Sequence, residues 1–182
     1  GTGRIGYGGG PVRPGANKQR LAALRAVAAE NSDTELLDLG SFQPYVSGGI
    51  AAADLAIASG ATAVLAYNDL VAFGLLDRFR QRGVRVPDDI SVVGMDDLPM
   101  SALTAPSLTS VGIPLVNCGR ASIDLLLSLL QQGASPPVHH HDLSFRLAVR
   151  QSTGVVNPTS TSALSRPPFS VSGPQPLPGP AV

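Results

Sequence analysis

The sequence has little charge and a single cysteine, and each shortage excludes a class of protein. Charged residues make up 14% of the 182 residues, and 13 basic residues balance 13 acidic ones, so the formal net charge at pH 7 is +0. A free-standing nucleic-acid-binding domain has a basic excess or a basic stripe, and this sequence has neither. The single cysteine, Cys118, excludes an internal disulfide, so the cysteine content gives no sign of an oxidising compartment.

Long apolar runs are also missing from the sequence. No stretch approaches the ~20 apolar residues that are needed to cross a bilayer. The first residues, Gly1 to Arg4, contain neither an initiator methionine nor the apolar core of a signal peptide. We therefore expect a cytoplasmic protein without membrane contact, and a chain that begins inside a longer one.

The end of the chain differs in composition from the rest. Residues 155–182 consist mainly of proline, serine, threonine and glycine, and they end in PQPLPGPAV. This segment lacks the apolar periodicity that offsets the entropy cost of ordering, which predicts a disordered tail. The alternative is a proline-rich ligand segment for a partner protein.

Strand and helix patterns alternate along residues 4–95. Short apolar runs predict strands at 4–9, 35–39, 62–67 and 90–95, and helical apolar spacing predicts helices at 17–30, 48–59 and 70–82. Continuous apolar runs such as TAVLAY and ISVVGM indicate strands that are buried on both faces, as in a parallel sheet covered by helices. The predicted fold class is therefore α/β, with a doubly wound open parallel sheet.

Polar side chains follow these predicted strands where the strands end. In open parallel sheets, ligands bind beyond the carboxyl ends of the strands. At that edge arginine and asparagine supply hydrogen-bond donors, aspartate supplies acceptors, and an aromatic ring can cover the apolar face of a sugar. The pattern predicts a site for a sugar or a similarly polar metabolite, with these candidate residues: Arg20, Phe42, Asn68, Asp69, Asp96 and Asp97.

Three of these candidates also have structural alternatives. Asp69 can cap the helix that follows it, and Asp97 can cap a short helix that begins at Pro99. Phe42 can be an ordinary core residue. Arg20 is expected in the first turn of its helix, where the helix dipole disfavours a cation, and away from that helix's apolar face. Its position therefore favours a ligand contact.

Three motifs follow one another in the stretch Ala61–Val111. They are A-x-N-D before a helix, then G-x-R-V-P-D-D-I-S-V-V-G-x-D-D, then P-x-L-T-S-V. Their order and spacing resemble the lac/galactose repressor (LacI/GalR) family of bacterial transcription regulators. Similar residues at both sides, including the closing VRQST of Val149–Thr153, extend the resemblance over residues 4–153.

The resemblance implies a periplasmic-binding-protein-like core of two α/β subdomains and a DNA-binding head. In this family, an effector that binds between the subdomains changes their relative orientation, and this change alters the regulator's affinity for operator DNA. By resemblance, Phe73 contributes to a homodimer interface, although it can instead pack within its own subdomain. Many members have a polar residue in place of Ile113, so here the effector is less polar or bound differently. The implied effector contacts are Arg20, Phe42, Asn68 and Asp96.

By the same resemblance, the chain is an incomplete regulator. Residues 1–114 and 143–154 correspond to a nearly complete C-terminal subdomain, 115–132 to a helix of the mostly missing N-terminal subdomain, and 133–142 to a connecting loop. Operator DNA is a partner only through the absent head. The apolar stripe of the 115–132 helix must then pack elsewhere, self-associate or remain exposed. With half of the cleft missing, we expect weak or no effector binding by this chain alone.

The sequence contains patterns that resemble catalytic or cofactor-binding motifs, but their positions do not suit such a function. GTGRIG precedes its strand instead of following it, and no G-K-[ST] ends the glycine loop, so no nucleotide cofactor is predicted. Neighbouring residues on a strand point to opposite faces, which separates Asp96 from Asp97 and prevents His139–His141 from converging on one metal. Cys118 has no nearby base. We expect no enzyme, cofactor or metal; the alternatives are a sugar-binding transport protein and a small α/β enzyme on nucleotides or sugars.

Overall fold

The computed structural model describes residues 3–11, 15–132 and 144–155. The predicted connecting loop 133–142 with its three histidines, and the predicted tail beyond residue 155, lie outside the described residues. The helices are α1 (Ala16–Glu30), α2 (Val46–Ala58), α3 (Asp69–Gln81) and α4 (Leu115–Gln132), and a short 3-10 helix, η1, spans Pro99–Ala102. The strands are β1 (Gly3–Gly9), β2 (Thr34–Ser41), β3 (Ala63–Ala66), β4 (Ser91–Asp96), β5 (Thr109–Gly112) and β6 (Arg146–Ala148).

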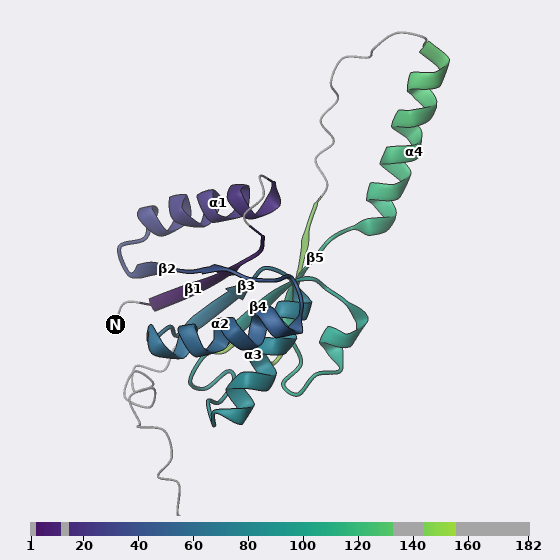
Figure 1. The fold of residues 1–182 in the computed structure, drawn as a ribbon. Coiled ribbons are helices and arrows are strands. Elements are labelled where there is room, and N and C mark those ends of the chain that lie inside the picture. Colours follow the sequence, from purple (N-terminus) through teal and green to yellow (C-terminus); the bar gives the residue numbers. More distant parts are fainter. Residues whose placement is uncertain (1–2, 12–14, 133–143, 156–182) are drawn as a thin grey trace, which may run out of the picture.

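All six strands form one sheet in the order β2-β1-β3-β4-β5-β6. The strands β1 to β5 pair in parallel, and β6 adds an antiparallel strand at the edge. Figure 1 shows α1 over one face of the sheet and α2 and α3 over the other. The predicted α/β class with a doubly wound sheet is thus confirmed, with β6 as its one departure from parallel pairing.

The strand order places a topological switch point at the carboxyl edge of the sheet. After β1 the chain passes outward to β2 and then returns across β1 to form β3, so the direction of winding reverses between β1 and β3. The loops that leave two such strands diverge toward opposite faces, which leaves space between them at the strands' carboxyl ends. The residues that follow β1, β2, β3 and β4 border this space.

Two glycines allow α2 and α3 to pack with their backbones in close approach. A Cβ atom built on Gly49 of α2 would lie 2.0 Å from the carbonyl oxygen of Val71, and one on Gly74 of α3 would lie 2.0 Å from that of Val46. Only glycine fits at this crossing, because carbon and oxygen cannot approach that closely. The two helices cover a core that includes Leu75, Phe79, Ile90, Val92 and Leu108.

The helices α1 and α4 are much less buried. No residue of α1 is fully buried, and Val27 on its predicted apolar face is 58% exposed. Figure 1 shows α4 extending away from the sheet. Its apolar side chains lie open to solvent, namely Leu115, Val116, Ile123, Leu126, Leu127 and Leu130. Among the described residues, no helix has the length and apolarity that crossing a membrane would need.

Candidate functional site

Arg20 reaches from α1 to the end of β3. Its Nη1 donates a hydrogen bond of 2.5 Å to the carbonyl oxygen of Tyr67, 47 positions along the chain. Its guanidinium carbon lies 5.1 Å from the centre of the Tyr67 ring, which is within range of a cation–π interaction. The side chain is half-buried. Arg20 is therefore held at the carboxyl edge of the sheet, with further N–H groups available there for a ligand.

Asp96 ends β4 in a strained backbone conformation. Its φ angle is +116°, a region that residues with a side chain rarely adopt. The half-buried carboxylate accepts no hydrogen bond from any described residue. Burial raises the pKa of Asp96, the neighbouring carboxylate of Asp69 raises it further, and Arg20 offsets part of this rise. A carboxylate that is held without hydrogen-bond donors is suited to accept them from a ligand.

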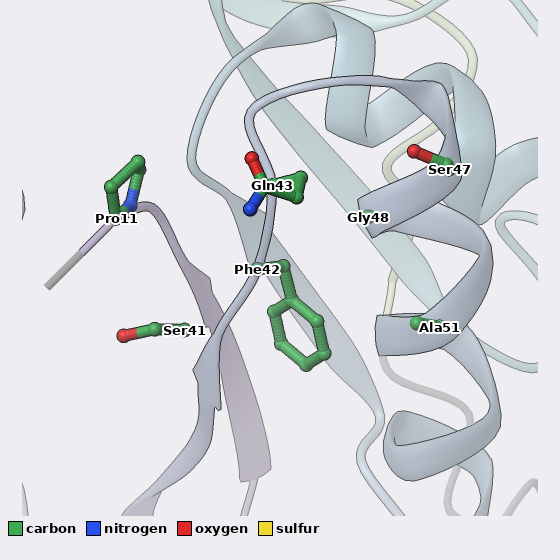
Figure 2. Close-up of a pocket in the computed structure, with 7 residues that line it drawn as sticks. All are labelled: Pro11, Ser41, Phe42, Gln43, Ser47, Gly48 and Ala51. Carbon is green, nitrogen blue, oxygen red and sulfur yellow. The ribbon is translucent and has the colours of Figure 1, made fainter.

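Phe42 follows β2 and borders a groove at the same edge of the sheet. The backbone N–H of Phe42 donates to the carbonyl oxygen of Gly9 at 2.9 Å, which ties the end of β2 to the end of β1. Figure 2 shows its ring between the end of β2 and the first turns of α2. The groove has a volume of ≈ 460 Å³ and is lined by Pro11, Ser41, Phe42, Gln43, Ser47, Gly48 and Ala51.

Asn68 has a structural function at the start of α3. Its Oδ1 accepts a hydrogen bond from the N–H of Val71 at 2.9 Å, which caps the helix, and its Nδ2 donates to the carbonyl oxygen of Pro44 at 3.1 Å. The second bond holds the loop that carries Phe42. Because only one N–H of the amide remains available, Asn68 has little capacity left for a ligand.

Asp69 is fully buried and faces the interior. One carboxylate oxygen accepts from the hydroxyl of Ser110 at 2.6 Å, and the other accepts from the hydroxyl of Ser101 at 2.6 Å and from the N–H of Leu98 at 2.8 Å. The side chain also packs on Gly94, where a Cβ atom would lie 2.2 Å from Asp69 Oδ1. The motifs A-x-N-D, G-x-D-D and P-x-L-T-S-V thus meet at one carboxylate, which no outside ligand reaches.

Asp97 is likewise occupied by internal partners. Its carboxylate accepts hydrogen bonds from Arg150 at 2.6 Å and from Arg146 at 3.0 Å, and its N–H donates to the Ser110 hydroxyl at 3.1 Å. The bond from Arg150 lowers the pKa of Asp97, burial opposes this effect, and Arg146 contributes further lowering. Asp97 therefore holds the segment around β6 against the end of β4.

Ser152 completes the attachment of the C-terminal segment. Its hydroxyl donates to the carbonyl oxygen of Val92 at 2.6 Å and accepts from the N–H of Thr109 at 2.8 Å. Its backbone bonds Val92 and Ser107, at 2.8 and 2.9 Å. The side chain is completely buried. The closing VRQST motif thus joins β4 and β5 through Ser152, although it lies more than 40 positions along the chain from the residues that it bonds in these strands.

Arg20 influences Asp96 electrostatically across this edge of the sheet, and Phe42 and Asn68 follow strands that end at the same edge. Asp69 and Asp97 lie nearby but face internal partners. Two residues at this edge, Tyr7 and Tyr67, were not predicted from the sequence. Tyr67 directly follows β3, so the strand-end argument could have included it, whereas nothing in the sequence singles out Tyr7. Burial raises the pKa of the Tyr7 hydroxyl, and Arg20 beside it counteracts this rise.

The described residues lack the side-chain groupings that hold metal ions in proteins. No three of their histidine, cysteine, aspartate and glutamate side chains are grouped as metal ligands would be. Every fully buried polar side-chain atom in these residues has a hydrogen-bond partner. The donors of Arg20, the carboxylate of Asp96 and the ring of Phe42 are suited to recognition of a polar molecule by hydrogen bonds and by aromatic contact.

Comparison with known proteins identifies the family of this chain. Residues 1–153 match the family described as periplasmic binding protein-like domain. The chain is 35% identical over 158 residues to the HTH-type transcriptional regulator reg1 of Streptomyces lividans, a match that covers 82% of this chain and 45% of that protein. The chain thus spans about half the length of this relative.

Solved structures of regulators have the same fold. The transcription regulator CcpA of Lactococcus lactis superposes with a TM-score of 0.74 at 26% sequence identity, over 85% of this chain and 57% of that one. The transcriptional regulator CelR in complex with cellobiose gives a TM-score of 0.73 at 30% identity, over 84% of this chain and 47% of that one.

Proposed function

Since the chain belongs to the periplasmic-binding-protein-like family, among the LacI-type transcription regulators, we propose that it is one half of the effector-binding core of such a regulator. The effector is a sugar or a related polar metabolite, and it binds at the carboxyl edge of the sheet. The observation that carries this proposal is the half-buried, strained carboxylate of Asp96, which has no hydrogen-bond donor among the described residues and lies beside Arg20.

The chemistry of the edge fits a polyhydroxylated ring. Arg20 donates hydrogen bonds to hydroxyl oxygens, and Asp96 accepts hydrogen bonds from hydroxyl protons. The ring of Phe42 covers the C–H face of the sugar. Asn68 contributes at most its one remaining N–H group and mainly holds the Phe42 loop. We leave Asp69 and Asp97 out of the proposed site, because internal donors occupy both carboxylates.

The function as a regulator implies parts that the chain does not contain. Operator DNA is contacted by an N-terminal head, which agrees with the chain's net charge of +0 and with its helix-turn-helix relatives. The exposed apolar side chains of α4 agree with a helix that belongs to a second subdomain. Effector binding between the two subdomains changes their relative orientation, and so controls the affinity for DNA in the cytoplasm.

Regulators of this type act as homodimers, and we propose that Phe73 of α3 lies in the dimer interface. Phe73 is half-buried and packs partly on its own core, so part of the side chain remains for a partner. A Phe73→Glu variant of the intact regulator should be monomeric by light scattering, at a protein concentration where the unmodified regulator is dimeric. An unchanged dimer would exclude Phe73 from the interface.

A sugar-binding transport protein is the second candidate, and a small α/β enzyme is the third. The relatives compared above are transcription regulators, which supports the first proposal over both. The hydroxyl–carboxylate pairs at this edge, Ser101 and Ser110 with Asp69, are completely buried, so they give an enzyme no specific support.

Thermal unfolding with a panel of sugars that includes cellobiose tests the proposal. A sugar at about 100 times its dissociation constant stabilises the folded chain by about 2.7 kcal/mol. For a chain of this size, that gain raises the melting temperature by about 5–11 °C. Asp96→Asn and Arg20→Ala should each abolish the rise, whereas the control Asp77→Asn, on the exposed side of α3, should preserve it.

The effect of pH gives a second readout of the same site. The carboxylate form of Asp96 accepts the sugar's hydrogen bonds, and its pKa is raised, so binding should weaken as the pH falls through that raised pKa. The Asp96→Asn variant should show no such dependence. Sugar stabilisation that persists in both Asp96→Asn and Arg20→Ala would contradict the site assignment.

A further inference from the structure

Arg20 needs support because its own helix is poorly anchored. No residue of α1 is fully buried, so packing of the helix alone does not fix the direction of a long side chain. The first turn of α1 is instead attached through Asn17, which exchanges two hydrogen bonds with the backbone of Gly10, at 3.0 and 3.1 Å. The hydroxyl of Tyr7 donates to the same Asn17 Oδ1 at 2.8 Å. This attachment fixes the start of α1 but leaves the guanidinium of Arg20 to be held separately.

Tyr67 contacts Arg20 in two ways. Its backbone carbonyl accepts the hydrogen bond from Nη1, and its ring lies under the guanidinium at 5.1 Å. The ring itself is confined, since a Cβ atom on Gly10 would lie 2.4 Å from Tyr67 Cε2. Gly10 is thus tied to Asn17 on one side and packs against the Tyr67 ring on the other. The ends of β1 and β3 and the start of α1 are thus linked through Gly10.

We propose that Tyr67 is a positioning residue, which uses its ring to hold the Arg20 guanidinium toward the space beside Asp96. A planar guanidinium that is stacked and hydrogen-bonded on one side presents its remaining N–H groups in a fixed direction. The hydroxyl of Tyr67 has no hydrogen bond among the described residues, so the ring rather than the hydroxyl carries the effect. The consequence for a sugar rests on the proposed function, but the effect on Arg20 does not.

Nuclear magnetic resonance of the arginine Nε–H groups tests this inference without any ligand. In the unmodified chain the order parameter of Arg20 Nε–H should be about 0.8, typical of a rigid group, with a proton shift moved by the ring. Tyr67→Leu should lower that order parameter below about 0.6, and Tyr67→Phe should preserve it. The Arg4 Nε–H, which donates to Glu35 at 2.9 Å, is the internal control and should not change.

A matched variant and a direct observation keep the test decisive. Tyr45→Leu makes the same substitution at a tyrosine that is 60% exposed, and it should leave Arg20 unchanged. An Arg20 that keeps its order parameter in Tyr67→Leu, or loses it equally in Tyr67→Phe, overturns the inference. If Tyr67→Leu does not fold, the unmodified chain decides, because an unshifted Arg20 proton with an order parameter below about 0.6 also overturns it.

Cellobiose binding then separates this inference from the proposed function. Loss of a cation–π contact should weaken binding by about 2–30-fold in Tyr67→Leu and leave Tyr67→Phe unaffected. An Arg20 that becomes mobile in Tyr67→Leu while cellobiose affinity stays unchanged supports the positioning of Arg20 by the ring and contradicts the proposed sugar site. The two ideas therefore fail in distinguishable ways.

Discussion

Removal of the Asp69 carboxylate tests whether one buried group holds the chain's motifs together. The side chain is 0% exposed and accepts three hydrogen bonds of 2.6 to 2.8 Å. Asp69→Ala leaves the N–H of Leu98 and the hydroxyls of Ser101 and Ser110 without their acceptor. A hydrogen bond to a charged group contributes about 1.5–3 kcal/mol, and relief of the cost of burying the carboxylate offsets part of the sum. We therefore expect a loss of about 3–5 kcal/mol in the free energy of unfolding.

Thermal unfolding measured by circular dichroism gives the magnitude, since the chain has no tryptophan to serve as a fluorescent probe. One kcal/mol corresponds to about 2–4 °C for a chain of this size, so Asp69→Ala should melt about 6–20 °C lower. The matched control is Asp77→Ala, which removes a surface ion pair with Arg80 and should change the melting temperature by less than about 2 °C. An Asp69→Ala variant that melts within about 2 °C of the unmodified chain would refute the reasoning.

Three further changes test other parts of the fold. Ser152→Ala removes the two buried hydrogen bonds that join the Ser152 hydroxyl to β4 and to β5, and it should lower the free energy of unfolding by about 1–3 kcal/mol in urea titrations. Gly74→Ala would place a Cβ atom 2.0 Å from the carbonyl oxygen of Val46, so it should lower the melting temperature. An unchanged melting temperature would contradict the close crossing of α2 and α3. Because the pKa of Asp97 is lowered on folding, its stabilisation is present above the unfolded pKa of about 3.9 and is lost as the pH falls through the folded pKa. Urea unfolding of Asp97→Asn should therefore show lower stability than the unmodified chain at pH 7, and the difference should shrink as the pH falls below about 3.9; equal stability at pH 7 would exclude the ion pair as a stabilising contact.

The periodicity of the sequence was sufficient to place most of the fold. The strands and helices predicted within residues 4–95 are found with ends that differ by at most two residues, because continuous apolar runs and helical spacing report burial directly. The last helix, 115–132, is found with the predicted ends. The strands β5 and β6 were not predicted as strands. Both are short, and β6 exposes Leu147, so their pairing depends on contacts with β4 and on partners distant in the sequence.

The sequence predicted which residues lie at the carboxyl edge of the sheet, but not which of their side chains already have internal hydrogen-bond partners. The strand-end argument selected residues that the structure places at one edge of the sheet, but that argument does not separate Asp69 from Asp96, because both follow a strand. In the structure, three donors surround Asp69, whereas none reaches Asp96. That difference depends on hydroxyls that are 32 and 41 positions away from Asp69, which no local pattern contains. The same holds for Tyr67, whose contact with Arg20 joins α1 to β3.

The helices α1 and α4 are exposed for the same reason. Both helices lie at places where the described residues provide little apolar surface to cover them. The apolar stripe of α4 was expected to lack its partner, whereas α1 was expected to bury an apolar face. Because no residue of α1 is fully buried, the helix is held partly by the polar contacts of Asn17, Arg20 and Arg25, and the proposed effector contact Arg20 is one of them.

A titration of the isotope-labelled chain with cellobiose, followed by backbone nuclear magnetic resonance, tests the central claim most directly. This method detects weak binding, which suits a chain that carries only one side of the cleft. The proposed site predicts saturable shifts that are largest at Arg20, Phe42 and Asp96, and absent at the ion pair between Asp54 and Arg78 on the outer face of α2 and α3. Saturable shifts confined to other parts of the chain, or shifts at Arg20 and Phe42 that persist unchanged in Asp96→Asn, would contradict it.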